Sequence, residues 1–133
     1  MTDDAVSPRI PLLVVEDDED IRSSLVQVLE EEGYDVAAAP NGRVALDALT
    51  GPQRRLPRLI LLDMMMPVLD GSGFMEEQSR TPDLANIPVL ILSASSVAQN
   101  APRPPNLATA LLKKPFTLER LLTTVRGLCT PSG

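Results

Sequence analysis

Short runs of β-branched and leucine residues alternate with amphipathic segments along this 133-residue sequence. In the amphipathic segments apolar residues recur at helical spacing, whereas the short runs are typical of buried strands. The strands we predict are residues 12–15, 34–38, 59–62, 88–92 and 108–112. Strands that alternate with helices form a parallel sheet covered by helices on both faces. The sequence therefore predicts an α/β fold, a (βα)5 doubly wound sheet of five parallel strands.

End signals place the helices between these strands. We expect the first helix to have Asp20 as its N-cap and to stop at Gly33, and the last to be capped by Thr117. A short helix is expected over residues 73–80. Prolines within residues 96–106 are hostile to a helix interior, so the fourth helix of the pattern is expected to be short or irregular.

Composition limits the possible partners and location of the protein, and the extent of the predicted elements sets the bounds of one domain. Asp and Glu outnumber Lys and Arg by 18 to 12, which disfavours binding to nucleic-acid phosphates. No apolar run reaches membrane-spanning length, and no basic amphipathic helix is present, so we expect no membrane partner. The single cysteine, Cys129, fits a reducing, cytoplasmic location. We expect a disordered tail over residues 1–9, one domain over 10–129 and a C-terminal tail over 130–133.

Polar side chains follow four of the predicted strands, at the edge of a parallel sheet where ligands bind. They are Glu16, Asp17 and Asp18 after the first strand, Asp63 after the third, Ser93 after the fourth, and Lys113 and Lys114 after the fifth. Clustered carboxylates repel, so we expect a hard cation with oxygen ligands, and Mg²⁺ is the usual choice beside phosphate. A carboxylate held beside Mg²⁺ and a lysine can attack phosphorus and form an acyl phosphate. The hydroxyl and the ammonium would stabilise the phosphoryl oxygens.

Each group alone also has an explanation that involves no ligand. The acidic run could be a solvated helix start, where the helix dipole favours carboxylates. Asp63 could cap a turn, Ser93 could bond to backbone, and Lys114 could be surface charge. Their combination at one sheet edge favours phosphoryl transfer.

The motifs VVEDDEDIR, LILLDMMMPVLDG, VLILSA and KKPF, in this order, resemble those of the receiver domain of two-component response regulators. The resemblance covers about residues 11–128 and implies a CheY-like, flavodoxin-like fold. It implies a signalling phosphoacceptor, not an enzyme, with slow self-dephosphorylation. The implied phosphodonor is a phosphohistidine on a sensor histidine kinase or phosphotransfer protein. The sequence contains no histidine, which agrees with a donor on another molecule.

The resemblance assigns roles to single residues. Asp63 matches the phosphoacceptor, which is also a metal ligand. Asp17 matches the direct Mg²⁺ ligand, and Glu16 the acidic residue that acts through water. Met65 matches the position whose backbone carbonyl binds the metal.

Further matches concern the phosphoryl group and the switch. Ser93 matches the switch hydroxyl residue and Lys114 the phosphate-binding lysine. Leu111 stands where the family usually has an aromatic switch residue, and the proline-rich segment replaces much of the fourth helix. Both departures alter the surface that the family uses for output and dimerisation.

These departures leave an alternative open, which is an atypical receiver that acts as a phosphorylation-independent protein-binding scaffold. An aspartyl phosphatase is disfavoured, because such enzymes usually have a general acid two residues after the nucleophile, and Met65 cannot transfer protons. No helix-turn-helix pattern follows Cys129, so we expect a stand-alone receiver or one taken from a longer protein. Its downstream partner would be a protein.

Overall fold

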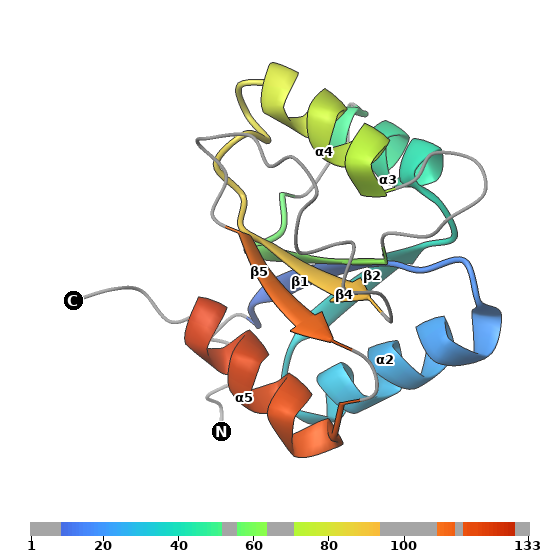
Figure 1. Ribbon diagram of the computed structural model, residues 1–133, viewed down its shortest axis with the longest axis vertical. Helices are drawn as coiled ribbons and strands as arrows, with labels where there is room; N and C mark the ends of the chain where they lie inside the picture. The colour runs from blue at the N-terminus through green and yellow to red at the C-terminus, as the bar shows by residue number, and fades with distance from the viewer. Residues whose placement is uncertain (1–8, 52–55, 64–70, 94–108, 114–115, 130–133) are drawn as a thin grey trace.

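The computed structural model describes residues 9–51, 56–63, 71–93, 109–113 and 116–129. Five parallel strands form one sheet in the order β2-β1-β3-β4-β5 (Figure 1). The strands are β1 (Pro11–Val15), β2 (Asp35–Ala39), β3 (Leu59–Asp63), β4 (Val89–Ser93) and β5 (Thr109–Lys113). The prediction of a doubly wound parallel sheet is confirmed, and each predicted strand agrees to within one residue at either end.

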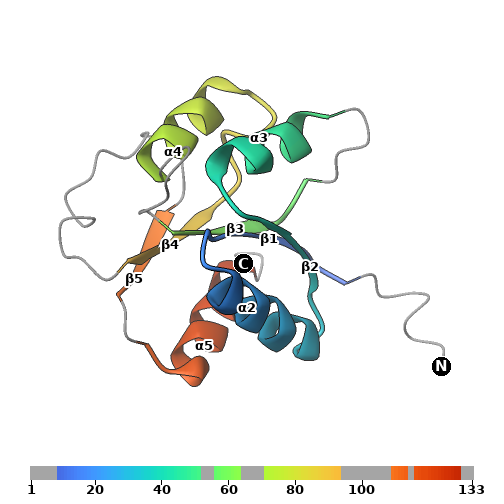
Figure 2. The same ribbon diagram turned by 90° about the vertical axis from the view of Figure 1, so that its right-hand side faces the viewer.

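Helices cover both faces of this sheet. They are α2 (Glu19–Glu31), α3 (Gly42–Thr50), α4 (Gly71–Arg80) and α5 (Leu118–Cys129). Figure 2 shows α3 and α4 on one face and α2 and α5 on the other. The label α4 belongs to the helix between β3 and β4. The irregular helix that we predict between β4 and β5 lies outside the described residues, as do nearly all residues of the two predicted tails.

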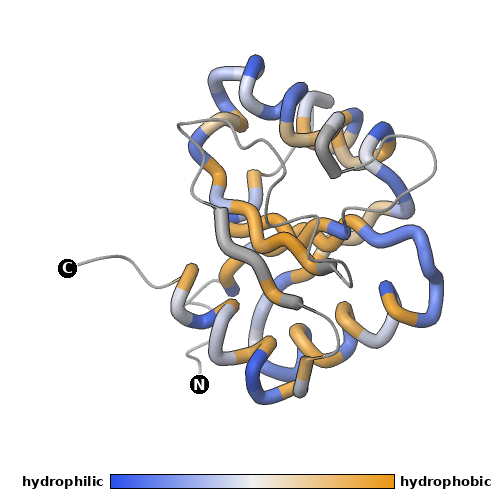
Figure 3. Tube along the Cα trace, viewed as in Figure 1, coloured by the Kyte–Doolittle hydropathy of each residue, from blue (hydrophilic) through white to orange (hydrophobic). Residues whose placement is uncertain are grey.

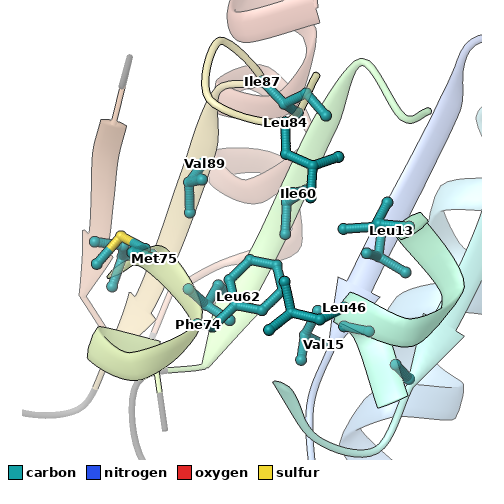
Figure 4. Close-up of a cluster of buried hydrophobic side chains, with 14 residues drawn as sticks. Leu13, Val15, Leu46, Ile60, Leu62, Phe74, Met75, Leu84, Ile87 and Val89 are labelled. Atoms are coloured by element: carbon teal, nitrogen blue, oxygen red, sulfur yellow. The ribbon is translucent and has the colours of Figure 1, made fainter. Parts of the chain in front are cut away.

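Each face of the sheet buries its own apolar cluster, because successive strand side chains point to opposite faces. On the face covered by α3 and α4, Leu13 and Ile60 of the strands share one cluster with Phe74 and Met75 of α4 (Figure 4). The neighbouring residue Leu12 belongs to the cluster on the α2 and α5 face. Figure 3 shows the resulting pattern, with hydrophobic strands in the middle and hydrophilic stretches on the outer helices. Burying each such side chain stabilises the fold by roughly 1.5–3 kcal/mol.

Helix α2 begins at a different cap from the predicted one. The backbone amide of Ile21 donates to Oδ1 of Asp18 at 3.0 Å, so Asp18 is the N-cap and the prediction of Asp20 is wrong. Asp20 lies in the first turn, where the helix dipole favours a carboxylate. Such a cap contributes about 1 kcal/mol. It also fixes the direction in which the chain leaves β1.

The predicted ends at Gly33 and Thr117 are confirmed, whereas the helix predicted over residues 73–80 begins two residues earlier, at Gly71. Gly33 has φ of 99°, a left-handed conformation that favours glycine, and the amide of Tyr34 donates to the carbonyl of Leu29 at 3.2 Å. At the start of α5 the amide of Arg120 donates to Oγ1 of Thr117 at 3.0 Å. These ends set the orientation of α2 and α5 against the sheet.

A buried amide braces the connection from α4 to β4. Nε2 of Gln78 donates to the carbonyls of Leu84 at 2.9 Å and of Ile87 at 3.0 Å. Gln78 is fully buried, and the sequence pattern gave no signal for it. Among the described residues, no helix combines the length and the apolar character needed to cross a membrane.

Candidate functional site

The register of the two central strands brings the acidic residues together. Val15 is the partner of Leu62 in the pairing of β1 with β3. The residues that follow them are Glu16 and Asp63, the last residue of β3, and they therefore lie side by side. The amide of Glu16 donates to the carbonyl of Ala39 in β2 at 3.1 Å, which extends the sheet to the first acidic residue. The position of these carboxylates therefore follows directly from strand pairing.

Glu16, Asp17 and Asp63 form a carboxylate cluster. One carboxylate oxygen from each of them lies within 4.8 Å of those of the other two. Glu16 is 2% exposed and Asp63 is 7% exposed, whereas Asp17 faces solvent. Three negative charges at this spacing repel one another, and burial strengthens the repulsion because the interior screens charge poorly. The cluster therefore favours a bound cation.

The donor atoms of the cluster fit Mg²⁺. This ion prefers carboxylate and other oxygen ligands at about 2.0–2.1 Å, so two of its ligands are at most about 4.2 Å apart. The carboxylate oxygens of Asp17 and Asp63 lie within 4.8 Å of each other, close enough for both to approach one ion after side-chain adjustment. The exposed carboxylate of Asp17 gives an ion access from solvent.

Asp18 belongs to the scaffold of the site, because its side chain caps α2. Its backbone amide donates to Oε2 of Glu16 at 3.2 Å, which orients the Glu16 carboxylate. The acidic run therefore divides into two residues of the cluster and one helix cap.

Sequence reasoning missed one basic residue of this region. Nη1 of Arg22, in the second turn of α2, donates to the backbone carbonyl of Glu16 at 2.9 Å and to that of Asp17 at 3.4 Å. The available signal was an arginine a few residues after an acidic run, at the start of a helix. Sequence alone does not show that its side chain turns back to the strand end.

The remaining predicted site residues are only partly described. Ser93 is the last residue of β4, next to Leu92, which pairs with Asp63. Leu111 lies in the middle of β5 and pairs with Ile91 of β4. Met65 and Lys114 lie outside the described residues. The structure thus places the backbone of Ser93 at the expected edge.

Two further titratable groups supply no ionised nucleophile at neutral pH. Burial raises the pKa of the Cys129 thiol above its ordinary value, although the charge of Arg58 acts in the opposite direction. Burial also raises the pKa of the Tyr34 hydroxyl. Cys129 packs in the apolar cluster on the α2 and α5 face, as its interpretation as a small apolar residue of the last helix predicts.

Comparisons with known proteins agree on one family. Residues 12–126 match the family model described as "Response regulator receiver domain". Response regulator MprA of Mycolicibacterium vanbaalenii is 38% identical over 120 residues, which are 90% of this chain and 50% of the relative. The chain thus spans about half the length of the curated relatives that it matches.

Solved structures have the same fold. The signal receiver domain of a signal transduction histidine kinase from Syntrophus aciditrophicus matches with a TM-score of 0.77 at 32% identity, covering 90% of this chain and 89% of that one. The response regulator protein TrrA of Thermotoga maritima, solved in complex with Mg(2+)-BeF, matches with a TM-score of 0.74 at 28% identity, covering 90% and 98%.

Proposed function

The chain belongs to the family of response regulator receiver domains, and on this premise we propose that Asp63 accepts a phosphoryl group in Mg²⁺-dependent two-component signalling. The observation that carries the proposal is the carboxylate cluster of Glu16, Asp17 and Asp63 at the carboxyl edge of the sheet. The proposed unit spans residues 10–129. It acts as a phosphoacceptor and not as an enzyme on a separate substrate.

In the proposed site, the carboxylates of Asp17 and Asp63 and the backbone carbonyl of Met65 would hold Mg²⁺, while Glu16 would act through water. When bound, the ion offsets negative charge on the phosphoryl oxygens. Support for this ion comes from the oxygen donors of the cluster and from the Mg(2+)-BeF complex of the related protein TrrA. The ammonium of Lys114 is proposed to bind the phosphoryl oxygens and offset their negative charge.

The proposed transfer step moves phosphorus from nitrogen to oxygen. A carboxylate oxygen of Asp63 forms a bond to phosphorus while the bond from phosphorus to the donor's imidazole nitrogen breaks. That nitrogen keeps the electron pair of the broken bond and takes up a proton. The hydroxyl of Ser93 then donates to a phosphoryl oxygen, and Leu111 occupies the second switch position. Water slowly hydrolyses the acyl phosphate in the same site.

Intact mass spectrometry tests this proposal. Incubation of the protein with Mg²⁺ and acetyl phosphate is expected to give a single phosphoryl adduct, and addition of EDTA beforehand is expected to prevent it. Without the cation, the cluster repels the anionic donor. Absence of the adduct, despite Mg²⁺ binding measured by calorimetry, would overturn the proposal and favour a phosphorylation-independent scaffold.

An apolar groove beside the site is the surface that we propose for the phosphodonor. It lies between α2 and α5 and is lined by Ile21, Leu25, Phe116, Leu118 and Leu121, among others. Ile21 is 40% exposed and Leu118 is 52% exposed, although both occupy the first turn of a helix whose inner face is apolar. Ile21 directly follows the acidic stretch of residues 16–20, so a protein seated here can bring a phosphohistidine to Asp63. We propose a histidine kinase or phosphotransfer protein as the occupant.

Ile21→Gln is expected to slow phosphotransfer from such a donor about tenfold, the effect of losing roughly 1.4 kcal/mol at an interface. The measurement is the rate of phosphotransfer from a kinase or phosphotransfer protein that phosphorylates the wild-type protein. Labelling by acetyl phosphate is expected to stay unchanged, because that donor needs no docking surface. Val44→Gln is a matched control, since Val44 is 42% exposed on α3, on the opposite face of the sheet. An equal loss with both donors would contradict the proposed groove.

A further inference from the structure

We propose that Arg22 is a positioning residue for the carboxylate cluster. Its guanidinium fixes the backbone of Glu16 and Asp17, so that both carboxylates aim at one cation. This inference rests on the proposed function, because it concerns the same Mg²⁺ site. It adds a residue that touches neither the ion nor the phosphoryl group.

The contacts of Arg22 link the helix to the strand end. The backbone amide of Arg22 donates to the carbonyl of Asp18 at 2.8 Å, so its own backbone is part of α2. Its side chain turns back, and Nη1 donates to the carbonyls of Glu16 at 2.9 Å and Asp17 at 3.4 Å. Both acceptors are backbone oxygens of cluster residues. The half-buried guanidinium thereby ties these two residues to the rigid helix.

Several hydrogen bonds hold the turn after β1, and all of them involve residues 16–18. The amide of Glu16 bonds to β2, and the amide of Asp18 bonds to the Glu16 side chain. Asp17 is exposed, and its carbonyl accepts from Arg22. Repulsion within the cluster favours opening of this turn before a cation binds. The contact from Arg22 opposes that opening.

Charge and positioning predict opposite results when Arg22 is changed. A guanidinium close to the cluster repels Mg²⁺, so removing its charge alone would tighten binding. Removing its two hydrogen bonds would instead loosen the turn and weaken binding, as loss of groups that orient metal ligands does. The sign of the change therefore separates a positioning role from a charge effect.

The test is calorimetric Mg²⁺ affinity at fixed ionic strength, measured with the melting temperature for wild type, Arg22→Met and Arg22→Lys. We expect Arg22→Met to weaken Mg²⁺ binding about tenfold, the lower end for groups that orient metal ligands. Arg22→Lys is expected to restore part of the affinity, because lysine keeps a donor but lacks the planar fork. Arg43→Met is the matched control, since Arg43 is exposed on α3.

Affinity equal to wild type in Arg22→Met, with only a lower melting temperature, would overturn the inference and leave Arg22 as a structural link. Tighter binding would overturn it in favour of the charge effect. If Arg22→Met does not fold, Arg22→Lys decides, because wild-type affinity in that variant also overturns the inference. A failure of the proposed function is distinguishable, since it appears in the wild-type protein as absence of Mg²⁺ binding or of the acetyl phosphate adduct.

Discussion

Asp63→Asn is expected to abolish the phosphoryl adduct that we expect the wild-type protein to form with acetyl phosphate and Mg²⁺. The change keeps the size of the side chain but replaces a carboxylate with a neutral amide, which is a poor nucleophile toward phosphorus. Asp63 is 7% exposed at the end of β3, which lies between β1 and β4. The other residues of β3 are apolar, so no second carboxylate on this strand can accept the phosphoryl group in its place. Intact mass spectrometry under identical donor and Mg²⁺ concentrations gives the result directly.

Two controls make this result specific. Asp47→Asn changes an exposed aspartate of α3 and is expected to leave the adduct unchanged. The melting temperature of Asp63→Asn is measured in parallel, because loss of the adduct identifies the phosphoacceptor only if the variant is folded. An adduct of wild-type abundance in the stable Asp63→Asn protein would show that the phosphoryl group goes elsewhere.

Phe74→Ala is expected to cause the largest loss of stability among single changes in the core, about 3–5 kcal/mol. The ring projects from α4 into the cluster above the sheet and is fully buried (Figure 4). The structure has no other fully buried aromatic side chain in its described part, so the smaller neighbours cannot fill the space that the ring leaves. Since domains are stable by about 5–15 kcal/mol, this loss removes a large part of the free energy of unfolding.

Urea denaturation followed by circular dichroism measures this loss. Leu118→Ala is the control, because Leu118 is 52% exposed and its truncation is expected to change stability by about 0.5 kcal/mol or less. A change below about 1 kcal/mol in Phe74→Ala would mean that α3 and α4 collapse into the cavity.

The fold could be predicted because its strands are short, apolar and well separated. Residues 59–62 illustrate this, since the run Leu-Ile-Leu-Leu is buried on both faces and has no helical period. Helix starts were harder to predict. Asp17, Asp18 and Asp20 are all plausible caps by type, and only the direction in which the chain leaves β1 places Asp18 beside the amide of Ile21.

The site could be predicted only in part. Strand-end position brings Glu16, Asp17 and Asp63 together, and this follows from topology alone. Arg22 and Gln78 could not be found in the same way, because both act through backbone carbonyls. Every residue has a backbone carbonyl, so the sequence pattern does not indicate which carbonyl accepts a hydrogen bond from a side chain.

The order of the strands decides which part of the molecule opens last. Strands β1 and β3, which end at the carboxylate cluster, have neighbours on both sides, whereas β2 and β5 form the edges. Local unfolding and amide hydrogen exchange are therefore expected to begin at the edge strands, and β1 and β3 are expected to separate only on global unfolding. We therefore expect heating to fray the edge strands first, while β1 and β3 stay paired up to the melting transition.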